Sequence, residues 1–258
     1  MNQSVIKALK LLDLFTAETP ELTLKDITAQ AKLPKPTVYR LLTALETMDY
    51  VHKMENTGYY RLGLKLLELG QLVSDQLELR KIALPYMQQL ASEINEAVHL
   101  VIINHTQATY IEKVDSNQAL RLFTRVGKSS PLHIGSGPKL LLAFLPKERQ
   151  EEIINQTELY TLDTQNSIAK SELFKQLQKI QDAGYAYSIG EQDADTTGIS
   201  YPIYDFHNQV IASLTVSGLS SHFSGGNLEF IKEKTAQTAQ VISRELGYTV
   251  QYEEGQAK

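Results

Sequence analysis

Residues 22–45 read LTLKDITAQAKLPKPTVYRLLTAL, and this stretch decides the fold expected for the N-terminal part of the chain. Thr23 is a good helix N-cap in front of an amphipathic run, which predicts a short helix over residues 24–31. The segment Lys32-Leu33-Pro34 breaks that run. Pro36 suits the first turn of a second helix, because the N–H that proline lacks would have no partner there. We expect this second helix to extend to about Thr47.

Apolar side chains at helical spacing predict one buried face on the second helix: Val38, Leu41, Leu42 and Leu45. Two short helices joined by a tight turn, the second opening with polar and basic residues, are typical of a helix-turn-helix. The second helix of such a motif lies in the DNA major groove, with its N-terminal residues towards the base edges. The candidate contacts to bases or adjacent phosphates are Lys35, Thr37, Tyr39, Arg40 and Thr43.

A predicted hairpin follows the second helix directly. Residues 50–54 and 59–62 have strand character, and the intervening Glu55-Asn56-Thr57-Gly58 is a turn sequence. A hairpin in this position is a wing, which would hold Lys53 and Arg61 beside the groove. We expect these two side chains, together with Lys25, to pair with DNA phosphates.

Leucine-rich segments flank the winged helix-turn-helix. Residues 5–15 predict a first helix that packs through Val5, Leu9, Leu12 and Phe15. Residues 62–83 read as a helical linker, beyond which Pro85 is expected to open a further helix. The linker leucines are too frequent for a solvated tether, so some should be buried against a partner chain or against the second domain.

The C-terminal part has a different periodicity. Short runs rich in Val, Ile, Thr and Tyr at residues 97–105, 108–115 and 120–127 predict an antiparallel meander, and further strands are expected near 185–189, 199–204 and 210–217. Helices are expected at 147–155, 170–183 and 227–246. We therefore predict a two-domain α+β protein: a winged helix-turn-helix over residues 1–63, a linker helix over 64–82, and an α/β domain over 83–258.

Composition limits the function. The 258 residues carry a net charge of −5 and no cysteine, which excludes disulfides, a thiolate metal site and a Cys nucleophile. Residues 1–80 hold ten basic and ten acidic residues, so DNA binding needs a local patch, which residues 32–45 supply without any acidic residue. No apolar run is long enough to span a membrane and no signal peptide is recognisable, so we expect a cytoplasmic protein.

The chain resembles the IclR family of transcriptional regulators over essentially its whole length. The resemblance rests on LPKPTVYRLLTALETMDYV (33–51), PLHIGSGPKLLLAF (131–144) and ISYPIYDFHNQVIASLTVSG (199–218). It implies a dimer, or a dimer of dimers, on a palindromic operator. It also implies a GAF-like C-terminal domain that binds a small metabolite, commonly a carboxylate or an aromatic acid.

The resemblance also assigns candidate effector-binding residues. Those in the loop and the helix after it are Leu132, Gly135, Ser136, Gly137 and Leu140, and those on the last strand are Thr215 and Ser217. An acidic pocket residue is expected upstream of the penultimate strand, where Glu191 and Asp193 are both possible. Pro138 replaces the glycine that usually precedes Lys139, which stiffens the start of the helix.

The residues themselves favour a binding site over a catalytic one. Glycines leading into a helix N-terminus present N–H groups that suit a carboxylate or phosphate, although such a turn can serve only to enter the helix. Gly135-Ser136-Gly137 is not a nucleophile elbow, because Ile134 stands two residues before the serine. His133 is expected to be partly buried and bonded to backbone. The six histidines lack metal-ligand spacing, so neither a metal nor a cofactor is expected.

We therefore hypothesise a non-enzymatic transcription factor, most simply a repressor, that binds double-stranded DNA and a small organic-acid effector as a homo-oligomer. The alternative is a small-molecule-binding or catalytic domain whose helix-turn-helix serves only dimerisation. The basic start of the second helix argues against that alternative.

Overall fold

The computed structural model describes residues 2–118, 124–161 and 167–249, and within these it describes the backbone but not the side chains of residues 74–76. The chain divides into two compact units, Met1–Leu77 and Glu78–Lys258. No helix among the described residues is long and apolar enough to cross a membrane.

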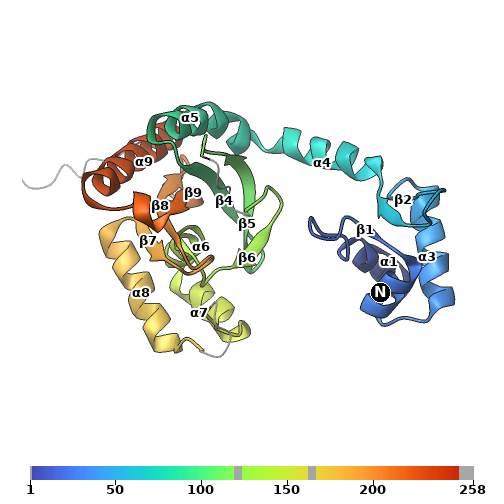
Figure 1. Cartoon of the computed structure of the whole chain (residues 1–258). Helices are drawn as coiled ribbons and strands as arrows, with labels where there is room; N and C mark the ends of the chain where they lie inside the picture. Colours follow the sequence, from blue (N-terminus) through green and yellow to red (C-terminus); the bar gives the residue numbers. More distant parts are fainter. Residues whose placement is uncertain (1, 119–123, 162–166, 250–258) are drawn as a thin grey trace, which may run out of the picture. The chain divides into compact units, whose positions relative to one another are not determined.

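The first unit is a winged helix-turn-helix followed by a helix (Figure 1). Its elements are α1 (Gln3–Leu12), β1 (Glu21–Leu22), α2 (Leu24–Ala31), α3 (Lys35–Thr47), β2 (Val51–Lys53), β3 (Tyr60–Leu62) and α4 (Leu64–Gln76). The strands form an antiparallel sheet in the order β1-β3-β2, in which β2 and β3 are the predicted wing.

The predicted start of α2 is confirmed in detail. Thr23 Oγ1 accepts a hydrogen bond from the Asp26 N–H at 3.2 Å, and Asp26 Oδ2 accepts one from the Thr23 N–H at 3.1 Å. This reciprocal capping box satisfies two N–H groups that the helix itself cannot pair. The helix ends at Lys32, whose left-handed backbone (φ 51°) turns the chain towards α3.

Only two of the four residues predicted to pack the first helix do so: Phe15 is buried in the core of this unit and Leu12 packs against it. Val5 and Leu9 are each 52% exposed, whereas Leu11 is buried in the core of this unit beside Phe15. The run of apolar residues is dense enough to form two overlapping helical stripes. Contacts with α2 and α3 select the stripe through Leu11, which periodicity alone does not distinguish.

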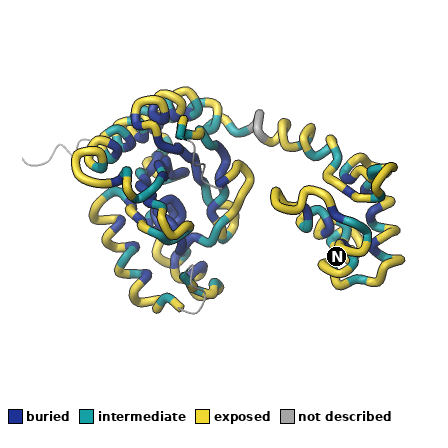
Figure 2. The backbone as a smooth tube through the Cα atoms, in the orientation of Figure 1, coloured by how far each residue is buried: buried dark blue, intermediate teal, exposed yellow. Residues whose placement is uncertain are grey.

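The second unit is built on one antiparallel sheet with helices on both faces (Figures 1 and 2). Its strands are β4 (Ala97–Asn104), β5 (Gln107–Val114), β6 (Ser129–Pro131), β7 (Ala186–Ile189), β8 (Thr196–Tyr204) and β9 (Val210–Leu219), in the order β6-β5-β4-β9-β8-β7. Its helices are α5 (Glu78–Ile94), α6 (Ser136–Ala143), α7 (Lys147–Gln156), α8 (Lys170–Ala183), the 3₁₀ turn η1 (Ser220–His222) and α9 (Gly225–Glu245). Helices α5 and α9 pack together against the sheet, while α6 packs against it with α8 behind.

In this unit, the predicted helix start at Pro85 is wrong, and the predicted strand at 120–127 lies partly outside the described residues. Pro85 does not open a helix but lies inside α5, because the buried positions Ala83, Met87 and Leu90 continue through it. Packing of this stripe offsets the single backbone hydrogen bond that proline removes. Part of the strand expected at 120–127 lies outside the described residues, and residues 124–127 form no strand.

A β-bulge in β5 determines which side chains reach which face of the sheet. Tyr110 pairs with Val101 and Glu112 pairs with Leu100, so Ile111 is an extra residue between them. Neighbouring strand residues point to opposite faces, and the extra residue therefore sends Tyr110 and Glu112 to opposite sides of the sheet. Tyr110 faces α6, whereas Glu112 accepts a hydrogen bond at 2.7 Å from Nε of Arg80 on α5.

Candidate functional site

The outward surface of α3 carries the basic and polar side chains predicted for it. Lys35, Tyr39, Arg40 and Thr43 are exposed and Thr37 is half-buried, while Val38, Leu42 and Leu45 hold the helix to the core. Among the described residues, no carboxylate forms an ion pair with Lys35 or Arg40. Their charges are therefore available to DNA phosphates or base edges.

The supporting basic residues lie around this helix. Lys25 on α2 and Arg61 on β3 are exposed, and Lys53 on β2 is exposed with its Nζ 5.9 Å from the centre of the Tyr60 ring. Thr43 also serves its own helix, because its Oγ1 donates to the Tyr39 carbonyl at 3.0 Å. That hydroxyl can still accept a hydrogen bond from a ligand.

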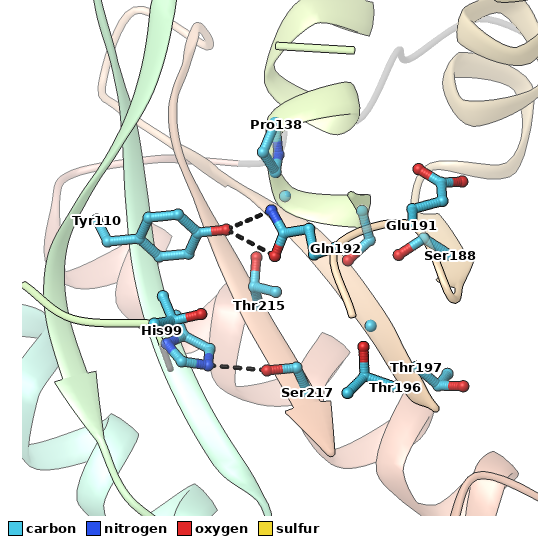
Figure 3. Close-up of a pocket in the computed structure, with 14 residues that line it drawn as sticks. His99, Tyr110, Pro138, Ser188, Glu191, Gln192, Thr196, Thr197, Thr215 and Ser217 are labelled. Atoms are coloured by element: carbon cyan, nitrogen blue, oxygen red, sulfur yellow. Dashed lines mark hydrogen bonds between the residues drawn. The ribbon is translucent and has the colours of Figure 1, made fainter. Parts of the chain in front are cut away.

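A polar pocket lies in the second unit between the sheet and the start of α6 (Figure 3). About 370 Å³ of space not occupied by atoms lies in and around it, part of which is open to solvent. The residues that line it are His99, Tyr110, Thr124, Ser136, Gly137, Pro138, Ser188, Glu191, Gln192, Thr196, Thr197, Gly198, Thr215 and Ser217. Every sheet strand except β6 contributes at least one of them.

The start of α6 is held by a carboxylate from the loop between β7 and β8. Glu191 Oε2 accepts a hydrogen bond from the Gly135 N–H at 2.9 Å, and Oε1 contacts Nζ of Lys139 at 2.5 Å. Lys139 is buried on α6, with only 6% of its side chain exposed. The carboxylate complements the positive end of the helix and neutralises a buried ammonium, so it fixes both the helix and the loop.

A chain of hydroxyl groups connects α6 with the last two strands. Ser200 Oγ donates to Ser136 Oγ at 2.8 Å and lies 2.8 Å from Thr215 Oγ1, which is 3.4 Å from Ser213 Oγ. Gly137 makes this approach possible, since a Cβ there would lie 2.5 Å from Thr215 Oγ1. The close packing at Gly137 explains why glycine occupies this position.

Two strand residues and one loop residue line the opposite side of the pocket. His99 Nε2 lies 2.8 Å from Ser217 Oγ, and the Tyr110 hydroxyl accepts a hydrogen bond from Gln192 Nε2 at 2.9 Å (Figure 3). Burial lowers the pKa of His99 to about 3, with a smaller contribution from Lys113, so its ring is neutral near pH 7. Burial also raises the pKa of the Tyr110 phenol.

The structure brings some of the predicted effector residues together and separates others. Ser136, Gly137, Glu191, Thr215 and Ser217 line the pocket. Leu132 and Leu140 do not, because both are buried in the hydrophobic core of this unit.

The remaining candidates lie at the edge of the pocket or outside it. Gly135 packs against the Gln192 side chain, since a Cβ at Gly135 would lie 2.8 Å from Gln192 Nε2. The Gly135 N–H is already hydrogen-bonded to Glu191. Of the two acidic candidates, Glu191 lines the pocket and Asp193 is exposed in the loop beyond it.

His133 is bonded to backbone as expected, with its Nε2 accepting a hydrogen bond from the Tyr160 N–H at 3.3 Å, but it is buried rather than partly buried. Among residues 2–118, 124–161 and 167–249, no group of three or more His, Asp or Glu side chains is arranged to hold a metal ion.

Sequence reasoning missed His99, Tyr110, Ser188 and Gln192. The first two lie in strands that read as ordinary apolar runs, and the useful signal would have been alternation: His99 stands two residues before Val101, on the same face of β4. Gln192 lies between the acidic candidates Glu191 and Asp193, and nothing in the loop sequence distinguishes it as a pocket residue.

Comparison with known protein families gives matches to both units. Residues 4–55 match the IclR helix-turn-helix domain, and residues 71–255 match the family described as bacterial transcriptional regulator IclR C-terminal.

Individual proteins match over most of their length. The chain is 37% identical over 248 residues to the HTH-type transcriptional regulator KipR of Bacillus subtilis, covering 96% of this chain and 98% of that protein. It is 28% identical over 225 residues to the HTH-type transcriptional repressor AllR of Escherichia coli, covering 87% and 83%. An IclR homologue from Microbacterium hydrocarbonoxydans in complex with 4-hydroxybenzoate matches with a TM-score of 0.81 at 25% identity, covering 96% and 100%.

Proposed function

The chain belongs to the IclR family of bacterial transcriptional regulators, and we propose that it represses transcription in the cytoplasm by binding a palindromic operator as a homodimer or a dimer of dimers. A small metabolite in the pocket of the second unit changes its affinity for that operator. The observation that carries the DNA-binding part is that Lys35 and Arg40 are exposed on α3 of a winged helix-turn-helix and have no ion-pair partner among the described residues.

The contacts follow from the placement of these side chains. Base or adjacent phosphate contacts come from the outward surface of α3, and phosphate contacts that position the protein come from α2 and the wing. The first group is Lys35, Thr37, Tyr39, Arg40 and Thr43, and the second is Lys25, Lys53 and Arg61.

Arg40→Ala weakens operator binding by ~1–3 kcal/mol per half-site if its guanidinium reads a base. The operator is first selected from a random duplex library with the purified protein, and gel shifts then compare the variant with the wild type. Arg244→Ala is the matched control, because Arg244 is also an exposed helical arginine but lies on α9 of the second unit. Unchanged affinity and specificity in Arg40→Ala would remove its proposed role.

The competing function is a ligand-binding protein whose helix-turn-helix serves only dimerisation. The salt dependence of DNA binding separates the two, since each neutralised phosphate releases counterions and steepens the fall of log K with log salt. The proposed regulator gives a clearly negative slope on the selected operator. A slope near zero would favour the competing function.

Strand β5 links the effector pocket to α5, the helix that follows α4, and could pass the effect of ligand binding to it. Because of the bulge at Ile111, pocket-lining Tyr110 and the Arg80 partner Glu112 point to opposite faces of the sheet although they are only two residues apart on β5. We propose that a ligand that displaces Tyr110 shifts Glu112 and thereby α5, provided that it binds the two arrangements with different affinity.

Arg80→Ala tests this route. With a ligand found by thermal shift, the variant should retain ligand binding but lose most of the ligand-induced change in operator affinity. Lys179→Ala on the exposed side of α8 is the control. An unchanged ligand effect in Arg80→Ala would show that the signal takes another path.

A further inference from the structure

We infer that the pocket takes a small aliphatic compound carrying several hydroxyl groups. The inference rests on the proposed function, in which this pocket is the effector site, and it specifies the chemistry of that effector. Three properties of the pocket wall carry it: its polarity, the balance of its charges, and its mixture of hydrogen-bond donors and acceptors.

The wall is dominated by hydroxyl groups. Of the lining residues, eight carry one: Tyr110, Thr124, Ser136, Ser188, Thr196, Thr197, Thr215 and Ser217. The other lining residues are two glycines, one proline, and the polar side chains of His99, Glu191 and Gln192. Binding pockets for apolar ligands are lined mainly by hydrophobic side chains, and this one is not.

The charges on the wall cancel. Glu191 is the acidic group of the wall, and its two oxygens are held by the Lys139 ammonium and the Gly135 N–H. The His99 ring is neutral, and no Lys or Arg side chain belongs to the described wall. The described part of the wall therefore offers a ligand carboxylate no unpaired cation, and the carboxylate of Glu191 belongs to that wall.

The hydrogen-bonding groups of the wall require a ligand that both donates and accepts. A carboxylate accepts only, whereas each serine, threonine and tyrosine hydroxyl of the wall can both donate and accept. Among the described residues His99 Nδ1 has no hydrogen-bond partner, and the side chain is 1% exposed. A hydroxyl group can satisfy either tautomer of a neutral histidine, either carboxylate oxygen, and any of the serine or threonine hydroxyls.

The wall is poorly suited to a ligand whose largest part is an aromatic ring. Its aromatic side chains, His99 and Tyr110, pack edge to face with each other, with ring centres 5.7 Å apart. Opposite them, Gly137 and Gly198 lie so close to their neighbours that a Cβ would meet Thr215 Oγ1 at 2.5 Å and Ser136 Oγ at 2.6 Å respectively.

Matched pairs of ligands test the inference on the full-length protein. Thermal shift and isothermal titration compare gluconate with hexanoate and glycerate with propionate, and include the uncharged polyols sorbitol and glycerol. The aromatic acid 4-hydroxybenzoate completes the panel. We expect at least one hydroxylated member to bind ~10-fold or more tightly than its deoxy partner, because the deoxy ligand leaves buried polar groups unpaired. The sorbitol and glycerol arms show whether hydroxyl groups suffice without a carboxylate.

Two variants locate the binding. Ser217→Ala and Ser188→Ala should each weaken binding of the hydroxylated ligand several-fold, whereas Ser171→Ala on the exposed start of α8 should not. Equal or tighter binding of hexanoate, propionate or 4-hydroxybenzoate would overturn the inference. Failure of every hydroxylated member to bind would overturn it as well.

Operator binding separates failure of this inference from failure of the proposed function. If 4-hydroxybenzoate or hexanoate changes operator affinity and the hydroxylated compounds do not, the ligand class is wrong and the regulated DNA binding stands. If a hydroxylated compound binds through Ser217 without changing operator affinity, the ligand class stands and the effector role is wrong.

Discussion

Glu191→Ala lowers the free energy of unfolding of the second unit by about 3 kcal/mol. The reason is the partner that the substitution leaves behind: the Lys139 ammonium is buried on α6 and loses the carboxylate 2.5 Å away. Gln176 Oε1 remains at 3.3 Å but carries no charge. The variant also removes the acceptor of the Gly135 N–H at the start of α6. Because 32% of the Glu191 side chain is exposed, we place the effect at the lower end for a broken buried pair.

Urea unfolding of the full chain, followed by near-ultraviolet circular dichroism, measures this loss. Asp193→Ala is the matched control, since Asp193 is an exposed carboxylate in the same loop, and it should stay within ~0.5 kcal/mol of the wild type. The double variant Lys139→Met/Glu191→Ala removes both charges and should regain part of the stability. A Glu191→Ala protein as stable as Asp193→Ala would show that the pair contributes nothing.

The ion pair of Glu191 with Lys139 also shows how much of the site can be predicted from the sequence. Glycines before α6 indicated an anion at its N-terminus, and the structure places a carboxylate there, but that carboxylate is the chain's own Glu191 on the Gly135 N–H. Among the described residues, three helices and a strand separate Glu191 from Gly135 in the sequence. A partner so distant in sequence leaves no local pattern, so sequence reasoning could only name Glu191 and Asp193 as alternatives.

The fold was easier to predict wherever short-range chemistry determines it. The Thr23 cap, the wing, and most of the helices and strands follow from periodicity and turn residues close to them. Two features depend on packing between distant segments instead. Leu11 rather than Leu9 turns into the core of the first unit, and the extra residue Ile111 changes the face on which Tyr110 emerges. A bulge shifts every later side chain by one position, and β5 contains no glycine to indicate it.

Some of the linker leucines were expected to be buried against a partner chain or against the second domain, and within this single chain several of them are exposed. Leu64 is 81% exposed and Leu67 is 70% exposed on adjacent turns of α4, with Leu72 and Val73 further along more than half exposed. A run of large apolar side chains on one helix is costly to leave in water, and such patches mark interaction surfaces. We propose that α4 pairs with α4 of a second copy, which would place two winged helices at the spacing of a palindromic operator.

Leu67→Ser raises the dissociation constant of the proposed dimer by ~100-fold or more. In a symmetric interface each substitution occurs twice, and burial of one leucine side chain stabilises by roughly 1.5–3 kcal/mol, so the pair removes roughly 3–6 kcal/mol. Sedimentation velocity over a range of protein concentrations measures the change. Val126→Ser is the control, because Val126 is 52% exposed but belongs to the second unit.

Operator affinity should fall in parallel with dimer loss, since one winged helix then contacts one half-site. A Leu67→Ser protein that stays dimeric at wild-type concentrations would exclude α4 as the pairing surface, and tight operator binding by a monomer would exclude the proposed palindromic mode.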